Sequence, residues 1–241
     1  MEKTNFIQKL YSAFTQNKID NVLDDIKAEK FFTLYKILVE TNKTFNLTAI
    51  TEENDVILKH FVDCASVIRH IPQGSKIIDI GCGAGFPSLP IAILRDDVQI
   101  TPLDSTAKKI GFIISTADEL SLVNISPIAQ RAEEYALKTR ESFDVAISRA
   151  VARLNILDEL CIPFVQKGGV FIAMKAPRGE EEYIEAKPGI QKLGCELKGK
   201  ETLELCFENK EITREIYVFS KKSSTPSQYP RNYSQITKKP L

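Results

Sequence analysis

One short glycine-rich segment constrains the fold of this chain more than any other feature. An apolar run at Lys76–Ile80 leads directly into three alternating glycines and then into Pro87. Glycine permits tight turns and lets a ligand approach the backbone closely, and proline is favoured in the first turn of a helix. The segment therefore predicts a buried strand, a ligand-binding loop and a helix, in that order. The glycines are Gly81, Gly83 and Gly85.

An acidic residue at the end of the next apolar run points to a nucleoside ligand. There the Asp104 carboxylate can accept hydrogen bonds from both hydroxyls of a ribose. A dinucleotide-binding loop has the pattern G-x-G-x-x-G, but its sixth position is Phe86 here. The order acid-x-G-x-G-x-G instead resembles the S-adenosylmethionine loop of class I methyltransferases. A glycine turn without any ligand is the alternative.

Short apolar runs alternate with helical patterns after Gly74, as in the helical stretch Thr106–Ser121. Such alternation predicts an α/β fold with a mostly parallel sheet and helices on both faces. The last two runs have no helix between them, so we expect an antiparallel last strand in a seven-stranded, Rossmann-like class I methyltransferase fold. Pro102 leaves the register of the second run open, because proline lacks a ladder donor. The runs are Lys76–Ile80, Val98–Leu103, Ile125–Ala129, Phe143–Ile147, Gly169–Met174, Thr202–Cys206 and Arg214–Phe219.

Three regions differ in character. Residues 1–70 carry helical periodicity and predict a helical N-terminal cap. Residues 71–219 hold the alternating pattern of the expected cofactor-binding domain. Residues 220–241 contain five lysine and arginine side chains and no acid, which predicts an extended basic C-terminal arm that contacts phosphate. The alternative is a solvated tail. The apolar stripe of the cap is Phe31, Leu34, Tyr35 and Leu38.

The composition indicates a cytoplasmic protein. The sequence has no apolar run long enough to span a bilayer and no start typical of a signal peptide. Five scattered cysteines without a C-x-x-C pair argue for free thiols and against a zinc site or a disulfide framework. We therefore expect neither a metal nor a membrane as partner. We also expect a monomer.

Several further motifs make the resemblance more specific. In order and spacing they resemble those of the small-subunit rRNA guanine-N7 methyltransferase family, also called glucose-inhibited division protein B. The resemblance spans nearly the whole chain. It implies S-adenosyl-L-methionine as the cofactor and 16S rRNA of the small ribosomal subunit as the substrate. The motifs are Asn46-Leu47-Thr48, Asp79–Pro87, Leu103-Asp104-Ser105, Arg131-Ala132-Glu133, Ser148-Arg149-Ala150, Ala173-Met174-Lys175 and Tyr229-Pro230-Arg231.

The resemblance also implies cofactor contacts at Gly81, Phe86, the Ala132-Glu133 pair and Arg149. The Ala132-Glu133 pair follows the third run, beside the glycine loop, where backbone groups can contact an adenine rim. Together with the residues that the loop and the ribose acid predict, the expected cofactor-binding set is Gly81, Gly83, Phe86, Asp104, Ala132, Glu133 and Arg149.

The sequence around Arg149 favours an acceptor that needs no deprotonation. Arg149 follows the fourth run, where class I enzymes place the groups nearest to the transferred methyl, and we expect it to be catalytic. The [DN]-P-P-[YF] motif of amino-directed enzymes is absent from that position, as are a cysteine nucleophile and a cluster of metal-binding acids. Guanine N7 fits, because its lone pair attacks directly and catalysis then depends mostly on alignment.

Basic residues near these strand ends are candidates for RNA contacts. Arg149 and Arg153 suit guanine O6 or a phosphate, and Lys175 at the end of the fifth run is a further candidate. The alternatives are that Arg149 only pairs with a core carboxylate and that Lys175 is merely exposed. One helical face is interpreted as packing or substrate lining: His60, Asp63 and Ser66.

Two rival functions remain open at this point. The same cofactor can serve another RNA or a small molecule as methyl acceptor. The chain can also be a non-catalytic ribosome assembly factor with a vestigial pocket, although its intact glycine loop, Asp104 and Arg149 argue against decay.

Overall fold

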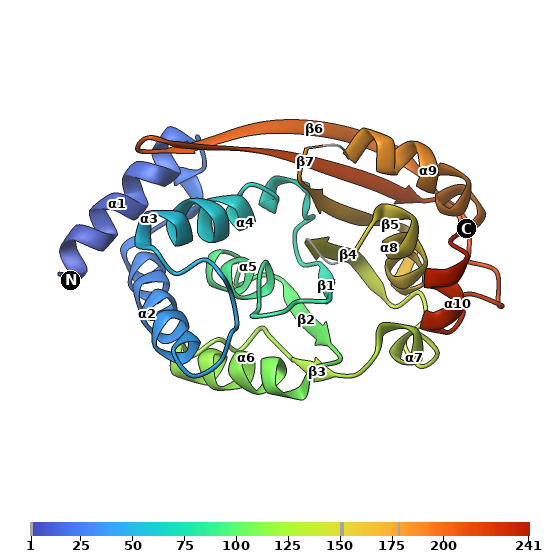
Figure 1. Ribbon diagram of the computed structural model, residues 1–241, viewed down its shortest axis with the longest axis horizontal. Coiled ribbons are helices and arrows are strands. Elements are labelled where there is room, and N and C mark those ends of the chain that lie inside the picture. Colours follow the sequence, from blue (N-terminus) through green and yellow to red (C-terminus); the bar gives the residue numbers. More distant parts are fainter. Residues whose placement is uncertain (1, 150–151, 178) are drawn as a thin grey trace.

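A seven-stranded sheet organises the computed structural model, which describes residues 2–149, 152–177 and 179–241 (Figure 1). The strand order is β3-β2-β1-β4-β5-β7-β6. Neighbours from β3 to β5 are parallel, and β7 is antiparallel to both β5 and β6. The fold class expected from the sequence is therefore confirmed. The strands are β1 Lys76–Ile80, β2 Gln99–Asp104, β3 Ile128–Ala129, β4 Phe143–Arg149, β5 Val165–Lys175, β6 Cys195–Phe207 and β7 Lys210–Lys221.

Helices cover both faces of the sheet, so β1 is apolar on both sides. Its Ile77 joins a core cluster that includes the N-terminal helices, whereas Ile78 joins a cluster with the helices of the other face. On the first face lie α1 Lys3–Gln16, α2 Asp25–Asn42, α3 Glu53–Val56, the π-helical turn η2 Ile57–Val62, α4 Asp63–Ala65, α5 Ser88–Leu94 and α6 Ala107–Glu119. On the second lie α7 Ala132–Ala136, α8 Leu154–Cys161, α9 Gly179–Lys192 and α10 Tyr233–Lys238 (Figure 1).

The elements described before β1 are helical, and they pack directly onto the sheet. The apolar stripe expected on α2 is buried in one core cluster with Val145 and Ile172 of the sheet. The N-terminal helices thus share their core with the strands. Short 3₁₀ turns connect the elements at Asp20–Val22, Ile68–His70 and Ile162–Phe164. No helix in the described ranges is both long and apolar enough to cross a bilayer.

Pro102 lies inside β2 without disturbing its pairing. The amide of Ile100 donates to the Asn124 carbonyl on the β3 side, whereas the Leu103 carbonyl accepts from Gly81 of the β1 side. Alternate residues of a strand direct their backbone groups to the same side, so the Pro102 nitrogen faces β3. β3 begins only opposite Leu103, so no ladder hydrogen bond to β3 is lost at Pro102. The pairing of β2 with β1 on the other side is regular, and Asp79 pairs with Pro102.

The C-terminal segment differs from the extended arm expected from its composition. It folds back onto the domain, and α10 packs against α8. The Lys221 ammonium is buried and donates to the carbonyls of Ile162 and Leu193. The Arg231 guanidinium forms a fork on the fully buried carboxylate of Glu159, with Nε and Nη2 each donating to it. At least two of the five cations therefore have structural roles.

We expect the Arg231–Glu159 pair to contribute strongly to stability. Arg231→Ala should lower the free energy of unfolding by about 3 kcal/mol, because it leaves a buried carboxylate without its partner. Lys222→Ala serves as the control, since it breaks an exposed pair with Glu196 and should cost less than about 1 kcal/mol. Urea unfolding measures both values, and equal losses would contradict a structural role for Arg231.

Candidate functional site

The glycine loop forms at the carboxyl end of β1, as the sequence predicts. Gly83 and Gly85 adopt φ angles of +57° and +84°, a region that favours glycine. A Cβ atom on Gly85 would lie 2.6 Å from Cδ1 of Leu89, so the loop also needs the small residue for close packing. The amide of Gly81 donates to the Leu103 carbonyl at 2.8 Å, which ties the loop to β2.

Asp104 joins the glycine loop to the first turn of α6. Its Oδ2 accepts from the amide of Gly83 at 3.1 Å, and its Oδ1 accepts from the amide of Thr106 at 2.8 Å. The ammonium of Lys109 lies 3.7 Å from Oδ2. Each carboxylate oxygen has a second lone pair, so Asp104 retains acceptor capacity for a ligand hydroxyl.

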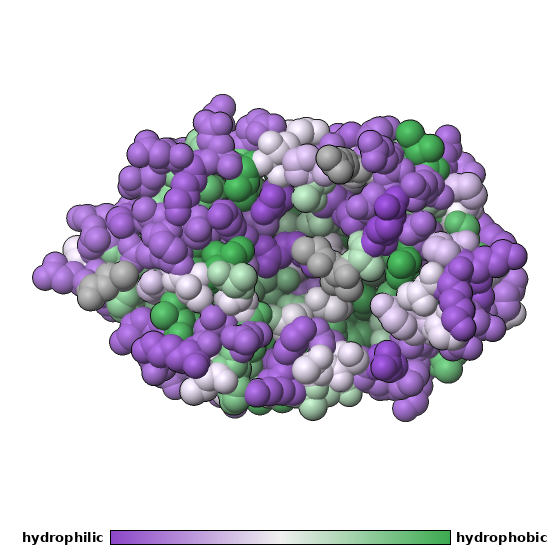
Figure 2. Space-filling view, in the orientation of Figure 1, coloured by the Kyte–Doolittle hydropathy of each residue, from purple (hydrophilic) through white to green (hydrophobic). Residues whose placement is uncertain are grey.

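Two cavities meet at the glycine loop, and both are lined by Gly81, Asp104 and Lys109. One has a volume of about 310 Å³ and extends between Ala132-Glu133 and Tyr233. The other, of about 360 Å³, extends to Phe86 and Arg149. Figure 2 shows that this face of the molecule is hollowed near its centre. The two cavities thus bring together all seven residues predicted as cofactor contacts: Gly81, Gly83, Phe86, Asp104, Ala132, Glu133 and Arg149.

Aromatic stacking shapes the second cavity. The His60 ring, carried by the π-helical turn, stacks on the Phe86 ring with centroids 4.3 Å apart and planes inclined by 10°. The guanidinium carbon of Arg149 lies 5.6 Å from the Phe86 centroid. Phe86 is therefore enclosed between a helix of the N-terminal region and the end of β4.

Arg149 is held by several acceptors at the edge of the cavity. Its Nη1 donates to the Lys59 carbonyl at 2.9 Å and to Oδ2 of Asp63 at 3.0 Å. Its Nη2 lies 3.1 Å from Nδ1 of His60. Arg214 of β7 contacts the same Asp63 oxygen at 3.2 Å. Arg149 thus does pair with a core carboxylate, as one interpretation of the sequence proposed, and it also lines the cavity with 15% of its side chain exposed.

His60 is held in its neutral form. Burial, reinforced by the charge of Arg149, lowers the pKa of His60 to about 3. Arginine has no acceptor atom, so Nδ1 must accept from Arg149, and the ring proton must lie on Nε2. Nε2 is 3.1 Å from Oγ1 of Thr48 and donates to it. The side-chain carbonyl of Asn42 accepts from the amides of Leu47 and Thr48, which fixes the loop that carries Thr48.

Two further titratable groups lie in the glycine loop or in the strand before it. Burial raises the pKa of Asp79 to about 7, and the carboxyl accepts a 2.6 Å hydrogen bond from the Ser88 hydroxyl. Cys82, which stands between Gly81 and Gly83, lines the second cavity. Burial raises the pKa of the Cys82 thiol well above its usual value, so it remains protonated and is a poor nucleophile.

The two predicted RNA contacts line neither cavity. Arg153 is 55% exposed and pairs with Glu185. Lys175 is only 7% exposed, and its ammonium donates to the Ala152 carbonyl and pairs with Glu182, each at 2.7 Å. A buried ammonium needs such partners, so neither the expected RNA contact nor mere exposure describes Lys175. Ala150 and Val151, next to these residues, lie outside the described residues.

Some lining residues were not predicted as site residues. Thr48 belongs to a motif that the sequence singled out without assigning it a role. The helical face interpreted from the sequence as packing or substrate lining divides: His60 lines the cavity, Asp63 holds Arg149, and the Ser66 hydroxyl only donates to the Asp63 carbonyl. Tyr233 reaches the first cavity from α10, and no local sequence signal indicates this return of the chain.

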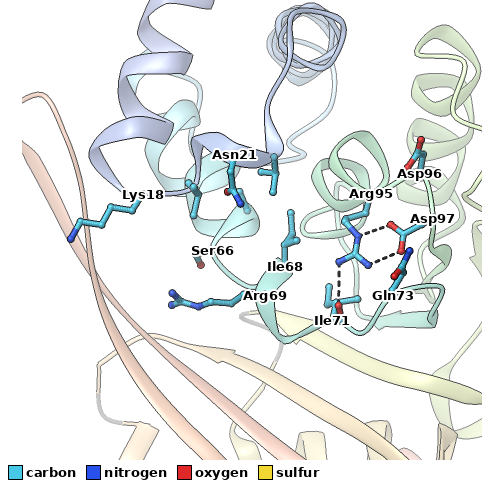
Figure 3. A pocket seen from close by; sticks show the side chains of 13 residues that line it. Lys18, Asn21, Ser66, Ile68, Arg69, Ile71, Gln73, Arg95, Asp96 and Asp97 are labelled. Carbon is cyan, nitrogen blue, oxygen red and sulfur yellow. Dashed lines mark hydrogen bonds and ion pairs between the residues drawn. The ribbon is translucent and has the colours of Figure 1, made fainter.

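A larger hollow of about 720 Å³ lies at the opposite end of the sheet (Figure 3). It includes Gln73 and Asp97, which precede β1 and β2, and none of the glycine loop. The Arg95 guanidinium there is engaged by Asp97 and by the Ile71 carbonyl. Size alone does not make it the site, because it lies away from the glycine loop and its Arg95 and Asp97 pair with each other. Within the described part of the chain, no three His, Cys, Asp or Glu side chains are grouped as metal ligands.

Sequence comparisons place the chain among named relatives. The family model for GidB, rRNA small subunit methyltransferase G, matches residues 27–205. Ribosomal RNA small subunit methyltransferase G of Clostridium botulinum (strain 657 / Type Ba4) is 41% identical over 240 residues, 98% of this chain and 99% of the relative. The protein of that name from Clostridium perfringens (strain SM101 / Type A) is 42% identical over 238 residues, 96% and 99% of the two chains.

Solved structures share the fold at low sequence identity. M. jannaschii TYW2 in complex with AdoMet gives a TM-score of 0.53 at 15% identity, covering 66% of this chain and 75% of that one. Precorrin-6y C5,15-methyltransferase from Geobacter metallireducens gives 0.50 at 14% identity, covering 74% and 91%. Identities this low support the fold alone.

Asp79 should make stability depend on pH. Its pKa is about 7 in the folded chain against an ordinary 3.8, so between about pH 4 and pH 7 the folded state keeps a proton that the unfolded state loses. Stability therefore falls as pH rises through this window. Asp79→Asn should make the fall shallower, by at most about 1.4 kcal/mol per pH unit. Urea unfolding across the window tests this, with Asp118→Asn on the surface as the control; an unchanged slope in Asp79→Asn would contradict the shift.

Proposed function

The chain belongs to the rRNA small subunit methyltransferase G family, and on that premise we propose that it transfers a methyl group from S-adenosyl-L-methionine to N7 of a guanine in 16S rRNA. One observation carries the proposal for the site: the second cavity, lined by Arg149 and Phe86, shares Gly81 and Asp104 with the first cavity, which has a size for a nucleoside. One cavity then serves the cofactor nucleoside, and the other serves the reacting atoms.

The described residues fit S-adenosylmethionine. Asp104 has acceptor capacity for the ribose hydroxyls and is fixed by two backbone amides. The first cavity is lined by Ala132 and Glu133 and by the apolar residues Leu103 and Leu160, a lining that suits a purine. Gly81, Gly83 and Phe86 border the second cavity, to which we assign the sulfonium end. When bound, the cofactor supplies an electrophilic methyl group.

The protonation states around the second cavity suit an acceptor that is already nucleophilic. His60 is neutral, and its only lone pair on nitrogen faces Arg149. Cys82 keeps its proton, and among the described residues that line this cavity Asp104 is the only carboxylate. Guanine N7 attacks with its own lone pair. With the cofactor bound, the S–C bond would break as the N–C bond forms, its electron pair would return to sulfur, and no described residue would have to accept a proton.

We assign Arg149 the task of orienting the guanine. Three of its five N–H donors engage Lys59, Asp63 and His60. The remaining donors suit guanine O6, which lies beside N7 on the same base edge. Because the guanidinium is anchored, it does not have to reorganise when the base arrives, and alignment supplies much of the rate. Arg153, exposed after β4, remains a proposed RNA contact. With this substrate we place the protein in the cytoplasm, as a monomer.

The cofactor site can be tested with two matched glycine variants. Gly83→Ala introduces a Cβ atom at φ +57° into open space beside the loop, so S-adenosylmethionine affinity should fall at least tenfold. Gly74→Ala carries similar backbone strain at φ +69° but lies at the other end of β1, and its affinity should match the wild type. Calorimetry measures both, with NAD as a comparison ligand. Tighter binding of NAD, or equal affinities in the two variants, would contradict the assigned site.

The reaction can be tested on small ribosomal subunits that lack the modification. Labelled S-adenosylmethionine should deliver one methyl group to guanine N7, identified by mass spectrometry of the product nucleoside. Arg149→Lys should lower kcat on the order of 100-fold at saturating RNA, because the planar fork is lost. Arg214→Lys is the control, since it alters the other partner of Asp63 outside the cavity, and it should lower kcat far less. Absence of transfer by the wild type would favour a non-catalytic assembly factor, and a product in another position would change the acceptor.

A further inference from the structure

An aromatic side chain stands exposed close to the second cavity. Phe45 has 39% of its surface accessible, and it lies in the loop between α2 and α3, which runs beside α6 in Figure 1. The same loop continues into Leu47 and Thr48, which line the cavity. The ring therefore presents an aromatic face to solvent beside a segment that lines the cavity.

The loop that presents Phe45 is held at several points. The Phe45 carbonyl accepts from the amide of Leu47 at 2.7 Å. Asn42 fixes the amides of Leu47 and Thr48, and the Thr48 hydroxyl accepts from the amide of Ile50 at 3.1 Å. The ring is therefore exposed on a fixed loop, and its exposure is a property of the fold.

A lysine from the other side of the cavity covers the ring. The ammonium of Lys108 lies 3.5 Å from the Phe45 centroid, a close cation–π contact. Lys108 is exposed in the first turn of α6, and the next residue, Lys109, lines both cavities. Phe45 and Lys108 thus meet beside the cavity entrance, one from each of the two segments that border it.

The cations expected from the sequence to bind RNA are largely engaged elsewhere. Lys175 and Lys221 are buried, and Arg231 is held by Glu159. An RNA that presents a base to Arg149 must still be bound by other residues near the cavity. Proteins that read single-stranded RNA stack its bases on aromatic rings and bind its phosphates with lysine or arginine.

We propose that Phe45 and Lys108 form a docking platform for the nucleotide next to the target guanine in the RNA substrate. The flanking base stacks on the Phe45 ring, and Lys108 moves from the ring to an RNA phosphate. This inference rests on the proposed function for its substrate. It adds a contact outside the reacting centre that acts on RNA binding and leaves the chemical step unchanged.

Three substitutions at Phe45 separate stacking from packing. Phe45→Trp keeps an aromatic face, Phe45→Leu keeps apolar volume without one, and Phe45→Ala removes both. With small subunits lacking the modification, KM should rise about tenfold for the leucine and alanine variants and stay near the wild-type value for tryptophan. The kcat, the melting temperature and the affinity for S-adenosylhomocysteine should stay within about twofold or a few degrees of wild type. The leucine variant distinguishes a stacking platform from a ring that only packs the loop.

Lys108 has a matched control in a second lysine–phenylalanine contact. The Lys36 ammonium lies 5.8 Å from the Phe32 centroid, on α2 away from both cavities. Lys108→Ala should raise KM severalfold and reduce the dependence of subunit affinity on log[salt] by about one unit. Lys36→Ala should change neither quantity.

The possible results are distinct. Unchanged KM in Phe45→Ala, or equal KM values for the leucine and tryptophan variants, would overturn the platform. A parallel loss of S-adenosylhomocysteine affinity or melting temperature would show that Phe45 is only structural. If the wild type transferred no methyl group, the proposed function would fail, while filter binding of subunits to the same variants would still decide whether Phe45 and Lys108 grip RNA.

Discussion

The buried pair between Arg149 and Asp63 holds the site together. It joins the end of the central strand β4 to a helix of the N-terminal region, and Arg214 adds β7 through the same carboxylate. His60 accepts from the same arginine and is neutral because it is buried, an effect that the charge of Arg149 reinforces. A buried ion pair contributes little net stability once desolvation is counted, but removing one partner costs several kcal/mol. The pair therefore fixes the helix that carries Asp63 against the ends of the strands. The second cavity lies where these segments contact each other.

The parallel sheet explains why cofactor and acceptor meet in one place. β1, β2 and β4 all end at the same edge, so the glycine loop, Asp104 and Arg149 are neighbours although they are far apart in the chain. The N-terminal region closes this edge from one side with Thr48 and His60. The C-terminal segment closes it from the other side with Tyr233. The site is thus completed by the two regions that flank the sheet.

Local signals were sufficient for the elements that carry the cofactor, and insufficient for long-range pairing. The glycine loop and Asp104 are defined by residues next to them, so their positions were predictable. The partner of Arg149 lies 86 residues away in sequence, and nothing near either residue indicates the pairing. Lys175 illustrates the same limit, because the local sequence around a lysine at a strand end is the same whether its side chain is exposed or buried. The fold of the C-terminal segment depends on Glu159, which the composition of that segment does not reveal.

The π-helical turn Ile57–Val62 sets the direction in which the side chains of this region point. Such a turn holds one more residue per hydrogen-bonded loop than an α-helix. Deleting a single residue there would restore a regular α-helix and change the angular position of the side chains inside the turn relative to those beyond it. His60 lies inside the turn and Asp63 just beyond it. That both side chains contact Arg149 therefore depends on the extra residue. Insertions and deletions in this stretch should accordingly be tolerated far less than side-chain substitutions on its outer surface.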